Sequence, residues 1–313
     1  MLISPINVET IYIHLSTHKH TPNKISQTEM SESSAIHKKV RYDLYRGHPN
    51  MKLLPQTEMK TIMSDILQED DESWRGYLNY GANAGDERFR IALKSFLNRR
   101  TQDDDMGAIT NDGTSFSSNE HELFITHGVS HGLELLCRTC TKPGDKVWIE
   151  RPTYFLAPMI FESNNLIVKA LPMMSDRKDN DGDIGQIDID RLIHMVEEEG
   201  TPPPKMIYII SSYHNPTGRS MTVNERKKLA TFAIRHGVIL VADEVYHLLD
   251  WEQKRDGEED LKDMITRRPA GIIHFNNIDM KVNYNQDDTT NKDRIGCCVS
   301  VSSFTKIWCP GLD

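Results

Sequence analysis

The sequence predicts an α/β fold with a mainly parallel β-sheet, and three observations support this. From about residue 122 onward, short apolar runs alternate with segments of helical character, which is typical of β-α units. Start and stop signals for helices separate these runs. The chain of 313 residues is 38% hydrophobic, which is adequate for the core of one large domain or two of medium size.

The residues before this alternation divide into two parts. Residues 1–40 are rich in Ser, Thr, His and Lys without a sustained period, so we expect a disordered leader, with Met30 as an alternative start. Residues 41–100 are expected to form an N-terminal arm and linking helices. Apolar residues recur there at helical spacing over 56–68 and again over 86–100.

The remaining residues, 101–313, are expected to form the large domain. It opens with an acidic, Gly- and Ser-rich stretch over 101–121, which predicts a loop. The apolar runs predict strands at 122–126, 146–150, 166–171, 206–210, 238–242 and 297–304.

One helix of this domain has clear boundaries, at 222–236. Thr222 and Glu225 can form a capping box at its start, and Gly237 stands where a helix is expected to stop. The charged, Asn-rich residues 252–295 interrupt the rhythm and indicate a long solvated insertion.

Composition excludes several classes of partner. The formal net charge is −9, and there is no arginine-rich face of the kind that binds nucleic acid. No stretch approaches the roughly 18 consecutive apolar residues of a membrane helix, and residues 1–40 lack the apolar core of a signal peptide. We therefore expect a cytoplasmic protein that binds neither nucleic acid nor membrane.

The five cysteines are Cys137, Cys140, Cys297, Cys298 and Cys309. An odd count without a secretion signal indicates free thiols. Cys137 and Cys140 form a C-x-x-C, but they fall in an apolar helical pattern where a spacing of three places both on one face. We interpret them as core thiols and expect no metal; the alternatives, a redox pair or a zinc site, lack a second C-x-x-C or a His pair.

Candidate functional residues follow the predicted strands, where ligands collect in open parallel sheets. They are Ser130 in "HGVSHGLELL", Tyr154 in "RPTYF", Asn215 in "SSYHNPTG", Asp243 and Tyr246 in "DEVYH", and Lys306. The first segment opens a helix, whose backbone N–H groups suit an anion such as phosphate.

Each of these residues also has a simpler structural interpretation. "HNPTG" is a turn sequence, Asp243 could cap a helix, Tyr246 could be core, and Lys306 alone could be a surface lysine. Asp243 and His247, four residues apart, could ligate a metal on a helix, although no third ligand lies nearby in the sequence.

Taken in order, the blocks "HNPTG", "ADEVY" and "SSFTKIWCPGL" resemble those of the class I and II aminotransferases, which are pyridoxal-phosphate enzymes of fold type I. "YGANAGDERFR" and "THGVSHGL" are similar to the upstream blocks of that family, so the resemblance covers about residues 42–312. It implies a three-layer α-β-α large domain and a pyridoxal 5′-phosphate cofactor. It also implies transfer of an amino group between an amino acid and a 2-oxo acid, by a ping-pong mechanism, in amino-acid metabolism.

The resemblance implies catalytic roles for three residues and contacts for two others. Lys306 would bond to the cofactor aldehyde and, once released by substrate, carry a proton between the substrate α-carbon and the cofactor C4′. Asp243 would pair with the protonated pyridine nitrogen and keep the ring cationic. Tyr246 and Asn215 would hydrogen-bond the phenolic oxygen, and Tyr154 would stack on the pyridine face.

The resemblance also assigns the phosphate and substrate contacts. The backbone N–H of Val129 and the hydroxyls of Ser130 and Ser303 would hold the phosphate. Tyr80 would reach the phosphate bound in a neighbouring subunit, which implies a homodimer in the full-length form. Gly47, in "YRGHPN", would let the N-terminal segment approach the substrate.

The last residues depart from the family pattern. Family members continue after "PGL" with an arginine of the phosphate site, whereas this chain has Asp313, whose carboxylate would repel a phosphate. The resemblance then implies that a core strand, between residues 122–126 and the strand before Lys306, is missing, together with most of a small domain of on the order of 100 residues. We therefore expect an incomplete product that is poorly active or inactive as given.

Two other functions remain open at this point. A lyase or decarboxylase of the same fold would use the same cofactor and break a different bond at the α-carbon. A non-catalytic protein that dimerises with a full-length paralogue would use the fold alone. A DNA-binding regulator is disfavoured, because residues 1–40 are too short and insufficiently basic for a DNA-binding domain.

Overall fold

A computed structural model of the chain describes residues 49–101, 123–174, 185–249 and 297–309. All of them belong to the second of two units, Pro49–Asp313. The expected leader over 1–40, nearly all of the loop over 101–121 and the insertion over 252–295 lie outside the described residues.

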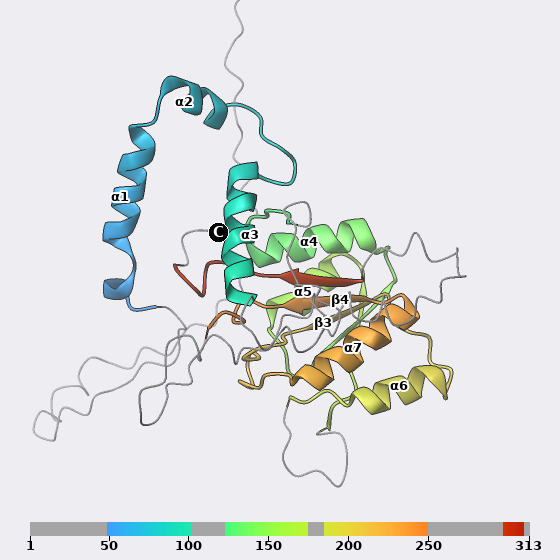
Figure 1. The fold of residues 1–313 in the computed structure, drawn as a ribbon. Helices are drawn as coiled ribbons and strands as arrows, with labels where there is room; N and C mark the ends of the chain where they lie inside the picture. The colour runs from blue at the N-terminus through green and yellow to red at the C-terminus, as the bar shows by residue number, and fades with distance from the viewer. Residues whose placement is uncertain (1–48, 102–122, 175–184, 250–296, 310–313) are drawn as a thin grey trace, which may run out of the picture. The chain divides into compact units, whose positions relative to one another are not determined.

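Five strands form one sheet in the order β2-β1-β3-β4-β5 (Figure 1). The strands are β1 (Lys146–Ile149), β2 (Ile167–Ala170), β3 (Met206–Ile209), β4 (Ile239–Asp243) and β5 (Cys298–Val301). All four pairings are parallel, with Tyr208 opposite Val241 and Asp243 opposite Val301. Each strand overlaps one of the predicted apolar runs, so the prediction of a mainly parallel sheet is confirmed.

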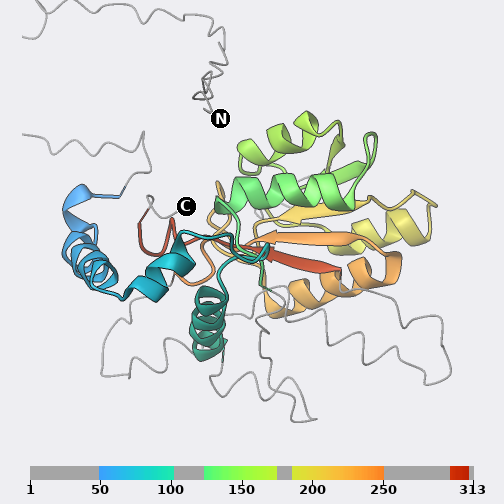
Figure 2. The same ribbon diagram turned by 90° about the horizontal axis from the view of Figure 1, so that it is seen from above.

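Helices cover both faces of this sheet (Figure 2). The four helices are α4 (Gly128–Cys140) and α5 (Leu156–Ser163) on one face, and α6 (Ile189–Glu197) and α7 (Val223–His236) on the other. Strand β3 supplies both interfaces, because successive side chains of a strand point to opposite faces. Met206 and Tyr208 belong to the buried cluster under α4 and α5, whereas Ile207 and Ile209 belong to the cluster under α6 and α7. The three-layer arrangement implied by the resemblance is therefore confirmed.

Helix α7 begins and ends at the predicted residues. The Thr222 hydroxyl accepts the Glu225 backbone N–H at 3.3 Å, and the Glu225 carboxylate accepts the Thr222 N–H at 2.7 Å, which completes the capping box. Gly237 ends the helix with a φ of 63°, a left-handed conformation that favours glycine.

We predict that Thr222→Ala lowers the free energy of unfolding by about 1 kcal/mol, because the first turn of α7 loses its side-chain cap. Urea unfolding followed by circular dichroism measures this loss. Thr231→Ala is the matched control: the Thr231 hydroxyl bonds to the Lys227 carbonyl within the same helix, so this change removes no cap. Equal stability of the two variants would contradict the assigned role of the cap.

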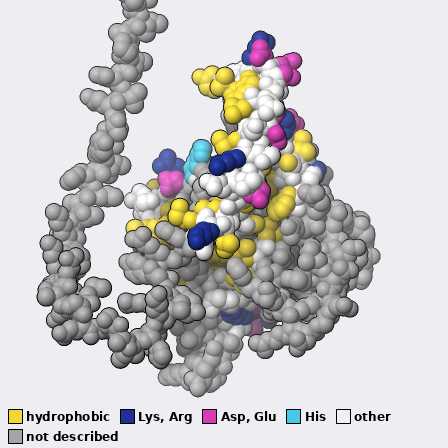
Figure 3. All heavy atoms as spheres, turned by 90° about the vertical axis from the view of Figure 1, so that its left-hand side faces the viewer, with side chains coloured by type: hydrophobic (Ala, Val, Ile, Leu, Met, Phe, Trp, Pro, Cys, Tyr) yellow, Lys and Arg dark blue, Asp and Glu magenta, His cyan; other side chains and the backbone are white. Residues whose placement is uncertain are grey.

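The residues that precede the sheet form η2 (Met51–Leu53), α1 (Gln56–Leu67), α2 (Asp71–Tyr77) and α3 (Glu87–Thr101). Helices α1 and α3 confirm the two helices predicted from apolar spacing. Neither α1 nor α2 has a buried residue. Figure 3 shows the face on which hydrophobic side chains of this region gather. The exposed apolar side chains of α1 and of the segment after α2 are Ile62, Met63, Ile66, Leu67, Leu78 and Tyr80.

The apolar run over 122–126 is not a strand in its described part, so this prediction is wrong. None of the five strands pairs with residues 123–126. Instead, the Ile125 N–H donates to the Ala84 carbonyl at 2.9 Å. Gly85, with a φ of 98°, allows this approach, because a Cβ there would lie 2.5 Å from Ile125 Cγ1. An apolar run predicts burial, but a strand also needs a neighbouring backbone with which to pair.

No helix among the described residues is long and apolar enough to cross a membrane.

Candidate active site

The carboxyl ends of the parallel strands meet at one edge of the sheet, and the candidate residues follow them. Tyr154 lies between β1 and α5, and Asn215 lies in the turn after β3. Asp243 is the last residue of β4, and Tyr246 is in the turn that follows. Lys306 lies in the turn after β5.

Asp243 is a buried carboxylate at this edge, only 4% exposed. Its Oδ2 accepts a hydrogen bond from the Tyr208 hydroxyl at 2.8 Å, whereas its Oδ1 has a longer contact of 3.4 Å with the Val245 N–H. Burial raises the pKa of the Asp243 carboxyl, and the Tyr208 hydrogen bond and the positive charge of Lys306 act in the opposite direction. A further cationic hydrogen-bond donor would therefore stabilise the charged form of this carboxyl group.

Two predicted phenols, those of Tyr246 and Tyr154, respond to the charge of this carboxylate. Burial raises the pKa of the Tyr246 phenol, the nearby charge of Asp243 adds to this rise, and the Asn215 side chain opposes it. Burial also raises the pKa of Tyr154, and the nearby charge of Asp243 adds to this rise. Tyr154 and Tyr246 both pack against the buried cluster under α4 and α5. The charge of the buried Asp243 carboxylate thus affects the pKa of both phenols.

Lys306 lies in a tight turn and is exposed. The Ile307 and Trp308 N–H groups both donate to the Phe304 carbonyl, at 3.1 and 2.8 Å, and so close the turn around Lys306. Earlier in the same turn, the Ser303 hydroxyl accepts the Thr305 N–H at 3.0 Å. Strand β5, which precedes this turn, is the parallel neighbour of β4, which ends at Asp243, and the charge of Lys306 opposes the rise in the pKa of Asp243.

The first turn of α4 supplies the candidate anion contacts. Gly128 begins the helix with a φ of 72°, and no side chain caps this end. The first N–H groups of a helix have no partner inside the helix, so they are suited to an anion. Val129 packs against the cluster that also holds Tyr154 and Tyr246, and Ser130 is exposed.

The structure does not bring Tyr80 of this chain to the group. Tyr80, between α2 and α3, is fully exposed, and its backbone N–H bonds to the Asn79 side chain. Gly47 lies outside the described residues.

A buried polar layer beside the site was not predicted from the sequence. Glu150, just after β1, accepts the Ile210 N–H at 2.7 Å, and burial raises the pKa of its carboxyl. His214 Nε2 lies 3.3 Å from Glu150 Oε2 but lacks full hydrogen-bond geometry. His214 Nδ1 contacts the Thr217 hydroxyl at 2.8 Å. Because His214 and Thr217 flank Asn215 in the sequence, this contact holds the turn that carries Asn215.

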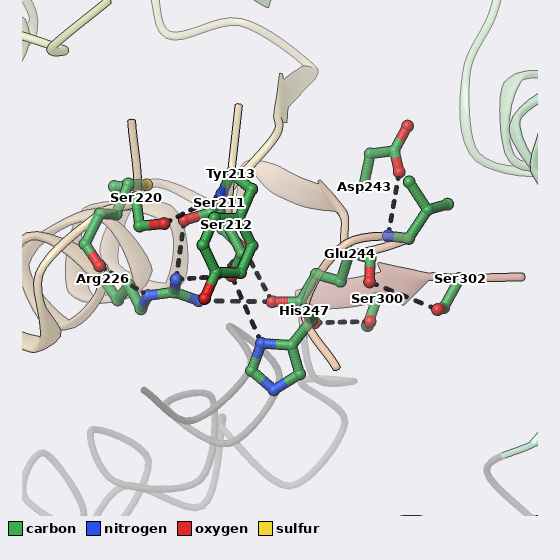
Figure 4. Close-up of polar contacts among 12 residues, drawn as sticks. Ser211, Ser212, Tyr213, Ser220, Arg226, Asp243, Glu244, His247, Ser300 and Ser302 are labelled. Carbon is green, nitrogen blue, oxygen red and sulfur yellow. Dashed lines mark hydrogen bonds and ion pairs between the residues drawn. The ribbon is translucent and has the colours of Figure 1, made fainter. Parts of the chain in front are cut away.

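Tyr208 was also missed, although the sequence contains a usable signal. It lies in the middle of the apolar run that forms β3, and a buried tyrosine hydroxyl needs a partner. Burial and the Asp243 carboxylate raise the pKa of Tyr208 well above its ordinary value, which keeps the hydroxyl a donor. Arg226 and Glu244 form a second missed cluster on the other side of β4 (Figure 4).

No group of three His, Cys, Asp or Glu side chains gathers in the described ranges in a way that could hold an ion. His247 Nδ1 lies 3.4 Å from the Ser212 hydroxyl. Cys137 is buried in α4, and Cys140, one turn on, is partly buried; both are free thiols.

We predict that Cys137 in the native protein resists alkylation at pH 8. Burial raises the pKa of its thiol to about 11, so only about one molecule in a thousand carries the reactive thiolate at that pH. Iodoacetamide labelling followed by peptide mass spectrometry measures this, with the more exposed Cys140 as the internal control. Unfolding should release full labelling of both thiols. If both stayed unlabelled after unfolding without reductant, a Cys137–Cys140 disulfide would be indicated instead.

Comparison with known proteins now identifies the family. The sequence profile of the aminotransferase class I and II family matches residues 53–269. The chain belongs to this family. Strand β5 and Lys306 lie beyond the matched residues.

Three relatives of this aminotransferase chain illustrate the similarity. An uncharacterized aminotransferase of Saccharolobus solfataricus is 26% identical over 85% of this chain and 53% of its own length. The multiple substrate aminotransferase of Thermococcus profundus has a TM-score of 0.59 at 23% identity, covering 85% of this chain and 53% of that structure. The kynurenine aminotransferase of Pyrococcus horikoshii, solved with PMP, has a TM-score of 0.59 at 22% identity, covering 85% and 52%. The two structures establish the shared fold.

This aminotransferase chain spans about half the length of the relatives it matches, between 53% and 61% for the first of them.

Proposed function

We propose that this chain provides the cofactor-binding part of a pyridoxal-phosphate-dependent aminotransferase. The reaction is exchange of an amino group between an amino acid and a 2-oxo acid, by a ping-pong mechanism, as a step of amino-acid metabolism. One observation carries the proposal. A carboxylate that is only 4% exposed, Asp243, ends strand β4, and the turn that carries Lys306 follows the neighbouring parallel strand β5.

The described residues fit pyridoxal phosphate. A buried carboxylate with a raised pKa, and with one oxygen held only by a 3.4 Å contact, suits a cationic ring N–H. The amide of Asn215, in the turn after β3, and the phenol of Tyr246, in the turn after β4, can both donate to a phenolate oxygen. The first turn of α4 suits the phosphate.

When bound, pyridoxal phosphate supplies an aldehyde for the amine and a cationic ring that accepts the electron pair left by α-proton removal. Each side chain then has a separate task. Asp243 holds a proton at the ring nitrogen. Lys306 holds the aldehyde carbon and, when freed, moves the proton between the substrate α-carbon and C4′. Asn215 and Tyr246 fix the phenolic oxygen, and Tyr154 covers the ring and excludes water.

The phosphate and substrate contacts complete this proposal. The Val129 N–H and the hydroxyls of Ser130 and Ser303 bind the phosphate, which gives affinity and orientation. Gly47 allows the N-terminal segment to approach the substrate.

An acceptor-dependent assay tests the proposed reaction. The purified chain is incubated with pyridoxal phosphate, an amino acid and a 2-oxo acid, and both products are measured by mass spectrometry. Transamination consumes the 2-oxo acid in a one-to-one ratio with the amino acid. Loss of carbon dioxide or of a side-chain fragment without use of the 2-oxo acid would instead indicate a decarboxylase or lyase.

We also propose that the protein acts as a homodimer in the cytoplasm. The exposed apolar side chains of α1 and the fully exposed Tyr80 support a second copy as the partner, with Tyr80 reaching the phosphate site of that copy. The five free cysteines favour a reducing compartment. Light scattering during size-exclusion chromatography measures the mass, and Ile66→Glu is expected to shift a dimer to monomer. A monomer at all concentrations would contradict the dimer.

A further inference from the structure

The buried cluster around Glu244 joins three segments of the chain at the carboxyl edge of the sheet (Figure 4). Glu244 Oε1 accepts the Ser211 hydroxyl at 2.8 Å, and Glu244 Oε2 accepts the Ser300 hydroxyl at 2.6 Å. Its backbone N–H donates to the Val301 carbonyl at 2.8 Å. One side chain thus connects the segment after β4 with the end of β3 and with β5.

Arg226, from α7, completes this cluster. It is fully buried and lies 3.5 Å from Glu244 Oε1. It donates to the Ser211 carbonyl at 2.7 Å and to the Ser212 hydroxyl at 2.9 Å, so it holds the start of the turn after β3. Burial lowers the pKa of the Arg226 guanidinium, and the Glu244 carboxylate opposes that effect.

The cluster stands apart from the proposed cofactor contacts. Asp243 and Glu244 are neighbours in the sequence, and Figure 4 shows Asp243 pointing away from the cluster around Glu244. Ser211 precedes Asn215 by four residues, and Ser300 precedes Lys306 by six. Each segment that Glu244 joins therefore carries one of the residues assigned to the cofactor.

We propose that Glu244 is a positioning residue, which sets the Asn215 turn and the Lys306 turn in register with Asp243. This inference rests on the function proposed above. The cost of a buried carboxylate and a buried guanidinium is offset by the hydrogen bonds they share with serine hydroxyls and backbone. A misplacement of about 1 Å at a cofactor contact is enough to weaken binding, so a rigid connection between the strand ends serves the site.

Hydrogen–deuterium exchange of the full chain without cofactor tests the structural part. Ser300→Ala removes one hydrogen bond and leaves the Glu244–Arg226 pair intact, so this variant is expected to fold. Glu244→Gln removes the charge opposite Arg226. It therefore tests both the connection to Ser211 and the connection to Ser300. Exchange should rise in residues 211–217 and 300–309 in Glu244→Gln, and in 300–309 in Ser300→Ala, by about tenfold, because a hydrogen bond to a charged group is lost. Residues 156–170 should be unchanged.

Cofactor affinity tests the functional part. Pyridoxal phosphate is titrated into the parent chain, Ser300→Ala and the control Ser163→Ala, whose hydroxyl bonds only to the Ile160 carbonyl within α5. We expect Ser300→Ala to bind about tenfold more weakly, with an altered visible spectrum of the bound cofactor, and to melt in one cooperative transition only slightly below that of the parent. The control should match the parent in all three measurements.

The outcomes separate the two proposals. Failure of the parent chain to bind pyridoxal phosphate would contradict the proposed function, and the exchange data would still decide whether Glu244 fixes the two turns. Parent-like affinity and spectrum in Ser300→Ala, or exchange that rises uniformly over the chain in both variants, would overturn the positioning role and leave Glu244 a general stabilising residue.

Discussion

Lys306→Ala should lower transamination by at least about a thousandfold, because the residue is both the amine that holds the cofactor and the group that moves the proton. In the structure, Lys306 follows strand β5, the parallel neighbour of the strand that ends at the buried Asp243. The rate of 2-oxo acid consumption, at saturating pyridoxal phosphate, measures the effect.

Lys228→Ala is the control for this change. Lys228 forms an exposed ion pair with Asp190 at 3.0 Å on the face of the sheet covered by α6 and α7, so its loss should leave the rate unchanged. A Lys306→Ala variant that binds cofactor and retains the parent rate would contradict the assignment of the catalytic amine.

Arg226→Met is expected to have the largest effect on stability, a loss of about 3–5 kcal/mol in the free energy of unfolding. The change leaves the Glu244 carboxylate, 4% exposed, without its cation, and it removes the donors to the Ser211 carbonyl and the Ser212 hydroxyl. Urea unfolding monitored by tryptophan fluorescence measures the loss.

The control for Arg226 is an arginine of the same helix that pairs at the surface. Arg235 bonds to Glu197 at 3.0 Å and is exposed, so Arg235→Met should cost less than about 1 kcal/mol. An equal loss in the free energy of unfolding for the two variants would contradict the large contribution to stability assigned to the buried cluster.

The sheet and its helices were predictable from local patterns. Apolar runs of four or five residues, such as 206–210 and 238–242, are bounded by turn residues and form the central strands β3 and β4. The capping pair Thr222 and Glu225 fixed the start of α7 correctly, because this signal depends on residues that are three apart in the chain.

The failure at residues 122–126 has a physical reason. The run has the composition of a strand, but pairing depends on residues distant in the chain, and none of the five described strands pairs with residues 123–126. The same limit applies to the buried cluster. Glu244 and Arg226 are 18 residues apart in the chain. The two serines that donate to Glu244 belong to different strands, because Ser211 follows β3 and Ser300 lies in β5. No local spacing therefore predicts this cluster.

The candidate site residues were predicted from the sequence, but the residues that surround them were not. The rule that ligands gather at the carboxyl ends of parallel strands, with the family resemblance, selected Asp243, Asn215, Tyr246 and Lys306 as neighbours. The partners that set their environment were not predicted. Tyr208 and the Glu150–His214 pair act through burial, which the sequence does not reveal for single polar residues within apolar runs.

Borohydride trapping of the cofactor tests the central claim most directly. The parent chain is incubated with pyridoxal phosphate, reduced with sodium borohydride, digested, and mapped by peptide mass spectrometry. The account predicts one stoichiometric phosphopyridoxyl group, on Lys306, which disappears in Lys306→Ala and is reduced in occupancy in Asp243→Ala. A label spread over surface lysines, or a single label on another lysine, would contradict it.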